Sequence, residues 1–215
     1  MKKIKLVALL VATVTFSLNA FAGGAKYKVS ITNLTKSISF TPIMVAAHRD
    51  KTTFFELGQI ASDDLGRVAE GGDTSGIAAM FNGNHSQLQS VAGLLAAGET
   101  TELLFENLPR RSRFSIASML LPTNDAFVAA QSISVKKGHR SKTIYLRAYD
   151  AGTETNDEAC VSIPGPTCGG EPFSANDEGE GFVHVHSGIH GIADLSASQY
   201  SWNNPVLKVT ITRLR

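Results

Sequence analysis

Three acidic residues stand at the ends of strand-like segments, where carboxylates can bind a metal ion. Asp125 closes the turn that begins at Pro122, and Asp150 and Glu154 follow a segment that ends at Tyr149. Carboxylates backed by loops with free carbonyl oxygens can supply the roughly six to eight oxygen ligands that Ca²⁺ takes. Asp is also common in turns for conformational reasons alone. The residue types by themselves therefore leave both interpretations open.

A second group of candidate ligands lies in the segment 181–191. If the first part of this segment is a strand, alternation places His184 and His186 on one solvent-accessible face and the neighbouring valines toward the core. Two imidazoles on one face can bind copper or zinc, and His190 can fold back as a third ligand. The simpler interpretation, which we favour from the sequence, is a polar strand face.

A third group is cationic. Arg110, Arg111 and Arg113 lie together in one predicted turn. Guanidinium groups bind phosphates and sulfated sugars in a bidentate manner, so this turn is a candidate patch for an anionic ligand. A solvated turn, or an ion pair with a nearby carboxylate, is the alternative.

The segments that must position these groups have the pattern of an all-β protein. Residues 27–34 alternate apolar and polar side chains, as a half-buried strand does. In the segment 52–98 apolar residues recur at i, i+3 and i+4, with Ser62 and Asp73 as candidate N-caps, so we expect short helices inserted after the first strand. Evenly spaced strands with turn residues between them predict an antiparallel β-sandwich, in one domain of residues 23–215. The expected strands span residues 27–34, 101–106, 114–121, 127–135, 142–149, 181–187 and 206–214.

The first 22 residues predict export. Three lysines precede an apolar run that ends at the small-residue site Ala20–Ala22, the layout of a signal peptide cleaved before Gly23. Removing 22 of 215 residues leaves 193, and the 17 lysines and arginines that remain of 20 face 19 acids, a net charge of about −2. Without a basic excess, nucleic acid is not the expected partner. No other segment is apolar enough to predict a transmembrane helix.

The chain has two cysteines, Cys160 and Cys168. In an oxidising compartment a disulfide between them is the expected state. Two thiols alone do not make a structural zinc site, which needs four ligands. The cysteines lie in a segment from 150 to 181 that is rich in Gly, Pro, Asn and acidic residues, and loops this long are usually functional or disordered.

Six further segments occur in an order that matches a known family: Phe40–His48, Ala61–Glu70, Leu104–Arg111, Pro122–Val128, Tyr149–Thr153 and Pro205–Arg215. They resemble the N-terminal domain shared by F-spondin and mindin, the spondin N-terminal domain family, and together they cover most of the mature chain. The resemblance implies an extracellular adhesion or matrix module. It also implies an antiparallel β-sandwich with a divalent cation, usually taken as calcium, at its loop end.

The resemblance also implies a set of metal ligands. The metal-binding acids of the family match Asp125 and Asp150, and single members add an acid at the position of Glu154 or of Glu106. Glu154 stands where the family usually has Asp. If successive strands run antiparallel, Asp125 and Asp150 leave the sandwich at the same end, whereas a simple meander places Glu106 at the opposite end.

We therefore expect an exported, non-enzymatic calcium-binding module for adhesion or recognition, periplasmic or extracellular, whose partner is an extracellular protein or carbohydrate. Neither a Gly-x-Ser-x-Gly motif nor a glycine-rich phosphate loop supports an enzyme. The alternative is a periplasmic copper- or zinc-binding protein, redox-active or not, built on His184, His186 and His190. The metal distinguishes the two hypotheses.

Overall fold

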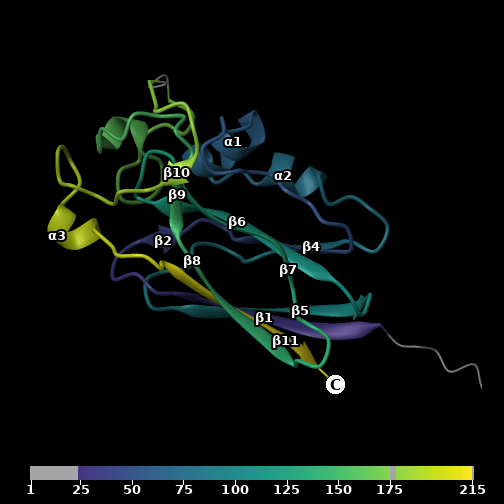
Figure 1. The fold of residues 1–215 in the computed structure, drawn as a ribbon. Coiled ribbons are helices and arrows are strands. Elements are labelled where there is room, and N and C mark those ends of the chain that lie inside the picture. The colour runs from purple at the N-terminus through teal and green to yellow at the C-terminus, as the bar shows by residue number, and fades with distance from the viewer. Residues whose placement is uncertain (1–23, 175–177, 215) are drawn as a thin grey trace, which may run out of the picture.

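The computed structural model describes residues 24–174 and 178–214, and the predicted signal peptide lies outside this part of the chain. Two antiparallel sheets pack face to face, which confirms the predicted β-sandwich (Figure 1). In residues 24–174 and 178–214, no helix is long and apolar enough to cross a membrane.

The smaller sheet has four strands and follows the predicted alternation. In its strand β1, Tyr27, Val29 and Ile31 are buried, while the residues between them are partly exposed. Val29 lies opposite Ile211 of β11, so apolar side chains from adjacent strands meet on the face turned toward the second sheet. The strand order is β5 (Thr100–Leu108), β1 (Ala25–Asn33), β11 (Leu207–Leu214) and β8 (Ser141–Leu146).

The larger sheet is covered on both faces. One face packs on the smaller sheet, and the other packs beneath the helices, so the central strand β6 is buried along nearly all of its length. From Phe114 on, the strand is apolar except for Ser115 and Ser118, which are buried and hydrogen-bonded. The order is β10 (His184–Val185), β9 (Ala148–Asp150), β7 (Ala126–Ser134), β6 (Arg113–Leu121), β3 (Met44–His48) and β4 (Gln87–Ser90), with β2 (Ser39–Phe40) also paired to β6.

The predicted helical segment forms two short helices over the larger sheet (Figure 1). In α1 (Asp63–Gly71) the hydroxyl of Ser62 accepts a hydrogen bond from the N–H of Leu65, as an N-cap does, and the apolar face is buried. In α2 (Ser75–Ala79) the cap is Thr74 rather than the predicted Asp73. The remaining short elements are η1 (Cys160–Ser162) and α3 (Ala197–Tyr200).

The structure corrects several strand boundaries. The sequence does not predict β2, β3 and β4, so the helices follow the third strand and not the first. The expected strand 142–149 is divided at Arg147: β8 pairs with β11 in the smaller sheet, and β9 pairs with β7 in the larger one. Because a strand that changes sheets keeps its alternation, the sequence pattern alone does not show the break.

Candidate metal site

Two strand ends bring Asp125 and Asp150 together. Asp125 immediately precedes β7, Asp150 ends β9, and the two strands are antiparallel with Ala126 opposite Asp150. The N–H of Ala151 donates to the carbonyl of Asp125 at 3.2 Å. Both aspartates are almost fully buried, at 0% and 1% exposure. The fold therefore holds two carboxylates side by side out of contact with bulk water.

One oxygen of Asp125 is hydrogen-bonded and the other is not. Oδ2 accepts from the N–H groups of Thr153 at 2.8 Å and Glu154 at 3.2 Å. Oδ1 is buried and has no hydrogen-bond partner among the described residues. Burial, and then the negative charge of Asp150, raise the pKa of Asp125 to about 7. Since a buried acceptor without a partner lowers stability, this oxygen is an available ligand for a cation.

Asp150 lies between an amide and two imidazoles. Its Oδ2 accepts from the side-chain amide of Asn156 at 2.7 Å, and its Oδ1 accepts from the N–H of Gly152 at 2.8 Å. The Nε2 of His184 is 3.5 Å from Oδ1, and the Nε2 of His186 is 3.7 Å from Oδ2. The carboxylate predicted for calcium and the histidines predicted for copper or zinc thus meet in one place.

Glu180 completes the group. Its Oε2 is 3.5 Å from the Nε2 of His184, and the ligand atoms of Asp150, Glu180 and His184 all lie within 4.8 Å of one another. The Glu180 side chain is 42% exposed, so the group opens to solvent on this side. One ion can therefore contact all three residues and still keep water ligands.

The two histidines differ in what their ring nitrogens can do. In His184, Nδ1 lies 3.1 Å from the carbonyl of Val185, an acceptor only, so in the neutral ring Nδ1–H donates the hydrogen bond and the lone pair is on Nε2. This is the usual arrangement of a metal-binding imidazole. In His186, the N–H of Gly188 donates to Nδ1 at 2.9 Å, so in the neutral ring the proton is on Nε2, which faces Asp150. His184 is therefore the better ligand.

The pKa values of the two histidines shift in opposite directions. Burial lowers the pKa of His184, but the Val185 carbonyl, Asp150 and Glu180 together raise it more, so the net shift is upward. Burial dominates at His186 and lowers its pKa, which keeps that ring neutral. Without a metal ion, the raised pKa favours the protonated form of His184, whose charge partly balances the carboxylates around it.

Residues 27–163 match the model of the Spondin_N family, which is more than half of the chain. The chain belongs to this family. No curated protein matches the chain. Domains of the spondin N-terminal family are in general extracellular recognition modules and not enzymes. The match includes Asp125 and Asp150 but ends before Glu180 and His184, so the histidine side of the site lies outside it.

Glu154 and Glu106, like Asp125, are outside the group formed by Asp150, Glu180 and His184. The N–H of Glu154 donates to Asp125, and Oε1 of its buried carboxylate accepts from the hydroxyl of Ser174 at 2.7 Å, while Oε2 has no hydrogen-bond partner among the described residues. Burial raises the pKa of Glu154 to about 7. Glu106 is exposed on β5 of the smaller sheet and forms an ion pair with Lys26 at 2.7 Å.

The predicted alternation of the histidine segment is wrong in this spondin domain. β10 has only two residues; Val183 is buried but Val185 is 39% exposed, and His186 is buried instead of solvent-accessible. The chain bends at residues 181–182, before the strand begins, and the N–H of Val183 donates to the carbonyl of Gln59 at 2.8 Å, outside the sheet. Alternation requires a continuous extended chain, and here it is interrupted.

The third predicted ligand, His190, is exposed, and its Nε2 lies 3.1 Å from the hydroxyl of Ser187. It is not part of the group formed by Asp150, Glu180 and His184. Glu180 is not among the ligands predicted from the sequence, although its position gives one signal. It precedes His184 by four residues in the acidic loop that leads into the strand.

The predicted disulfide is present in the same part of the spondin domain. Cys160 and Cys168 are joined at an S–S distance of 2.04 Å. They flank a small cluster of buried side chains, Ile163, Ile189 and Leu195, which is separate from the two larger parts of the core. The bond therefore supports loops that carry few other apolar contacts, in agreement with an oxidising compartment.

Proposed function

We propose that this spondin domain is an exported recognition module whose loop end is organised by a bound divalent cation, with calcium as the first candidate. Asp125, Asp150 and Glu180 would supply carboxylate oxygens, and water or a partner would supply the others. The observation that carries the proposal is the buried, unpaired Oδ1 of Asp125 beside Asp150. An ion at this position would neutralise carboxylates that otherwise repel one another.

The cation would act on recognition by fixing loops. Asp125 belongs to the β6–β7 turn, Asp150 to the start of the acidic loop, and Glu180 to its end, so one ion would join three separate segments. Phe182 is 43% exposed and packs against His184, with 5.4 Å between the ring centroids. An apolar ring next to an ordered polar loop suits contact with an extracellular protein or a carbohydrate, the partners that we propose.

The first test compares thermal unfolding with calcium and with a chelator. In wild type, calcium should raise the melting temperature, because an ion that binds only the folded state stabilises it by RT ln(1 + [L]/Kd). Asp150→Ala should lose most of this increase. Glu106→Ala is the matched control: it also removes a carboxylate, but one in an exposed ion pair, and should keep the full increase. Equal melting temperatures for wild type with calcium and with chelator would contradict the proposal.

A second candidate function is binding of zinc or copper. The observation that favours it is the lone pair on Nε2 of His184, directed at Asp150 and Glu180 while Nδ1 donates to a carbonyl. A mixed set of imidazole and carboxylate ligands suits these metals better than calcium. Because Asp150 belongs to both ligand sets, the two metals would compete for one site.

His184→Gln separates the candidates. If calcium is the ligand, the substitution should leave stabilisation by calcium within about twofold in Kd, since oxygen ligands carry the ion. If zinc is the ligand, zinc affinity should fall on the order of a hundredfold and calcium should not displace zinc from wild type. Isothermal titration with each metal measures both. If purified wild type retained stoichiometric zinc or copper and His184→Gln lost it, the proposed metal would be zinc or copper instead of calcium.

A further inference from the structure

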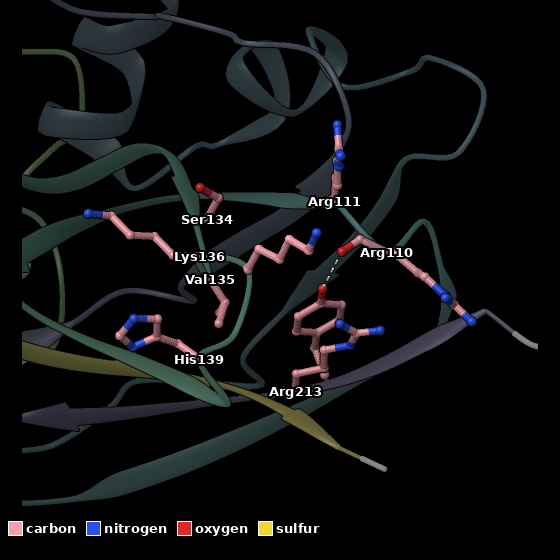
Figure 2. A pocket seen from close by; sticks show the side chains of 9 residues that line it. Arg110, Arg111, Ser134, Val135, Lys136, His139 and Arg213 are labelled. Carbon is pink, nitrogen blue, oxygen red and sulfur yellow. Dashed lines mark hydrogen bonds between the residues drawn. The ribbon is translucent and has the colours of Figure 1, made fainter.

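A cationic cleft lies at the end of the sandwich opposite the metal site. Its volume is about 510 Å³, and its walls come from the β5–β6 turn, the β7–β8 loop and the ends of β1 and β11. Figure 2 shows Arg110, Arg111 and Arg213 on one side of it and Lys136 and His139 on the other. We call it the basic cleft.

The basic cleft concentrates positive charge without acidic partners. Five of its lining residues are Arg or Lys, and no carboxylate lines it. Among the ion pairs of residues 24–174 and 178–214, none involves these five side chains, whereas Lys26, Lys28 and Arg67 all pair with acids at 2.7–2.8 Å. The whole chain is nearly neutral, at +1. A cleft lined by one sign of charge focuses the field and attracts counter-ions.

The backbone of the basic cleft is held in place. The hydroxyl of Tyr27 donates to the carbonyl of Arg110 at 3.1 Å, which ties the β5–β6 turn to β1 (Figure 2). The N–H of His139 donates to the carbonyl of Lys136 at 3.1 Å, and Gly138 has φ 87°, a conformation that favours glycine. The cationic side chains therefore extend from ordered turns.

Chemistry and size define the ligand. Guanidinium groups bind phosphate and sulfate through two parallel hydrogen bonds to two oxygens. A halide ion has no second acceptor atom, so an oxyanion fits this cleft better. The volume lies within the roughly 300–1,000 Å³ of small-molecule sites and is far above the roughly 30 Å³ share of a water molecule. A cleft of this volume with several cationic side chains can hold a ligand that has more than one phosphate or sulfate group.

We propose that the basic cleft binds a ligand that carries at least two phosphate or sulfate groups. This function is separate from the metal site, since the two lie at opposite ends of the sandwich and share no residue. Arg113, which the sequence grouped with Arg110 and Arg111, is not part of the lining. Its Nη1 is 3.4 Å from the carbonyl of Ser132.

Inorganic pyrophosphate is the probe, titrated by calorimetry in the presence of a chelator so that no metal ion mediates binding. Arg110→Gln/Arg111→Gln and Lys136→Gln/Lys137→Gln each remove two charges from the cleft and should weaken binding at least tenfold. Lys36→Gln/Arg147→Gln removes two exposed charges beyond the other ends of β1 and β8 and should change it less than threefold. Melting temperatures verify that all three variants fold.

No saturable binding to wild type, or an equal loss in the control variant, would overturn the proposal. The source of the ligand is then distinguished by two competitors of bound pyrophosphate, a sulfated disaccharide in solution and vesicles that contain phosphatidylglycerol. Displacement by the disaccharide identifies a soluble anionic saccharide, and displacement by vesicles alone identifies a lipid headgroup. If neither displaces pyrophosphate, the ligand is a soluble phosphate compound and neither a sulfated saccharide nor a lipid headgroup.

Discussion

Replacing Asp125 by asparagine is expected to stabilise the metal-free protein and to destabilise the calcium-bound one. Burial and the charge of Asp150 raise the pKa of Asp125 to about 7, so at pH 8 the folded protein contains a buried charge that the unfolded chain exposes to water. A difference of one pKa unit corresponds to about 1.4 kcal/mol. We expect metal-free Asp125→Asn to gain about 1 kcal/mol. The asparagine oxygen can still accept from Thr153 and Glu154.

With calcium at about a hundredfold excess over Kd, the order should reverse. Wild type should gain about 2.7 kcal/mol from the ion, and the variant should gain little, because it lacks the charge of the unpaired oxygen. Because the variant starts about 1 kcal/mol more stable, the net difference in calcium is about 1.7 kcal/mol, which for a domain of this size lowers the melting temperature by about 3–7 °C. Thermal unfolding of both proteins in calcium and in chelator measures all four values. The same order of stabilities in both buffers would contradict a cation at Asp125.

The free energy of unfolding of the metal-free protein should also depend on pH, because the pKa of Asp125 is raised. The folded protein binds a proton at Asp125 that the unfolded chain releases near pH 4, so the contribution of Asp125 to metal-free stability should be fully present below pH 4 and should be lost as pH rises to about 7. Asp125→Asn should reduce this fall. It should not remove it, because the pKa of Glu154 is also raised to about 7.

Replacing Glu158 by alanine is expected to lower the free energy of unfolding by about 3 kcal/mol and to disorder the loop that carries His190. Glu158 is 2% exposed, and its carboxylate accepts from three successive N–H groups, those of His190, Gly191 and Ile192. Hydrogen bonds to a charged group are worth about 1.5–3 kcal/mol each, and they do not add fully. The loss should extend to the small core cluster of Ile163, Ile189 and Leu195.

Hydrogen exchange measures this effect locally and chemical denaturation measures it globally. The amides of residues 189–195 should lose protection in Glu158→Ala, whereas those of the central strand β6 should lose it only by the change in global stability. Glu171→Ala is the control, because it removes an exposed carboxylate from the same acidic loop. Unchanged protection of residues 189–195 would show that the loop does not depend on Glu158.

The sequence by itself determined the features that depend on neighbouring residues. Alternation along β1, the N-cap Ser62 of α1 and the turn residues between strands are local patterns, and they predict the strands, a helix start and the sandwich class. The acids directly after strands predict that Asp125 and Asp150 leave at one end of the sandwich. The disulfide needs only two cysteines eight positions apart and an oxidising compartment.

Only the tertiary structure decided which of these groups meet. After β8 the chain passes from the smaller sheet to the larger one, where β9 pairs with β7. This pairing places Asp150 between Asp125 and His184. It therefore joins two ligand sets that the sequence presents as alternatives. The basic cleft likewise combines residues near 27, 110, 136 and 213. The physical reason is that strand pairing and burial are set by packing between segments far apart in the chain. A periodic pattern reports which face of a segment is buried, but not what it is buried against.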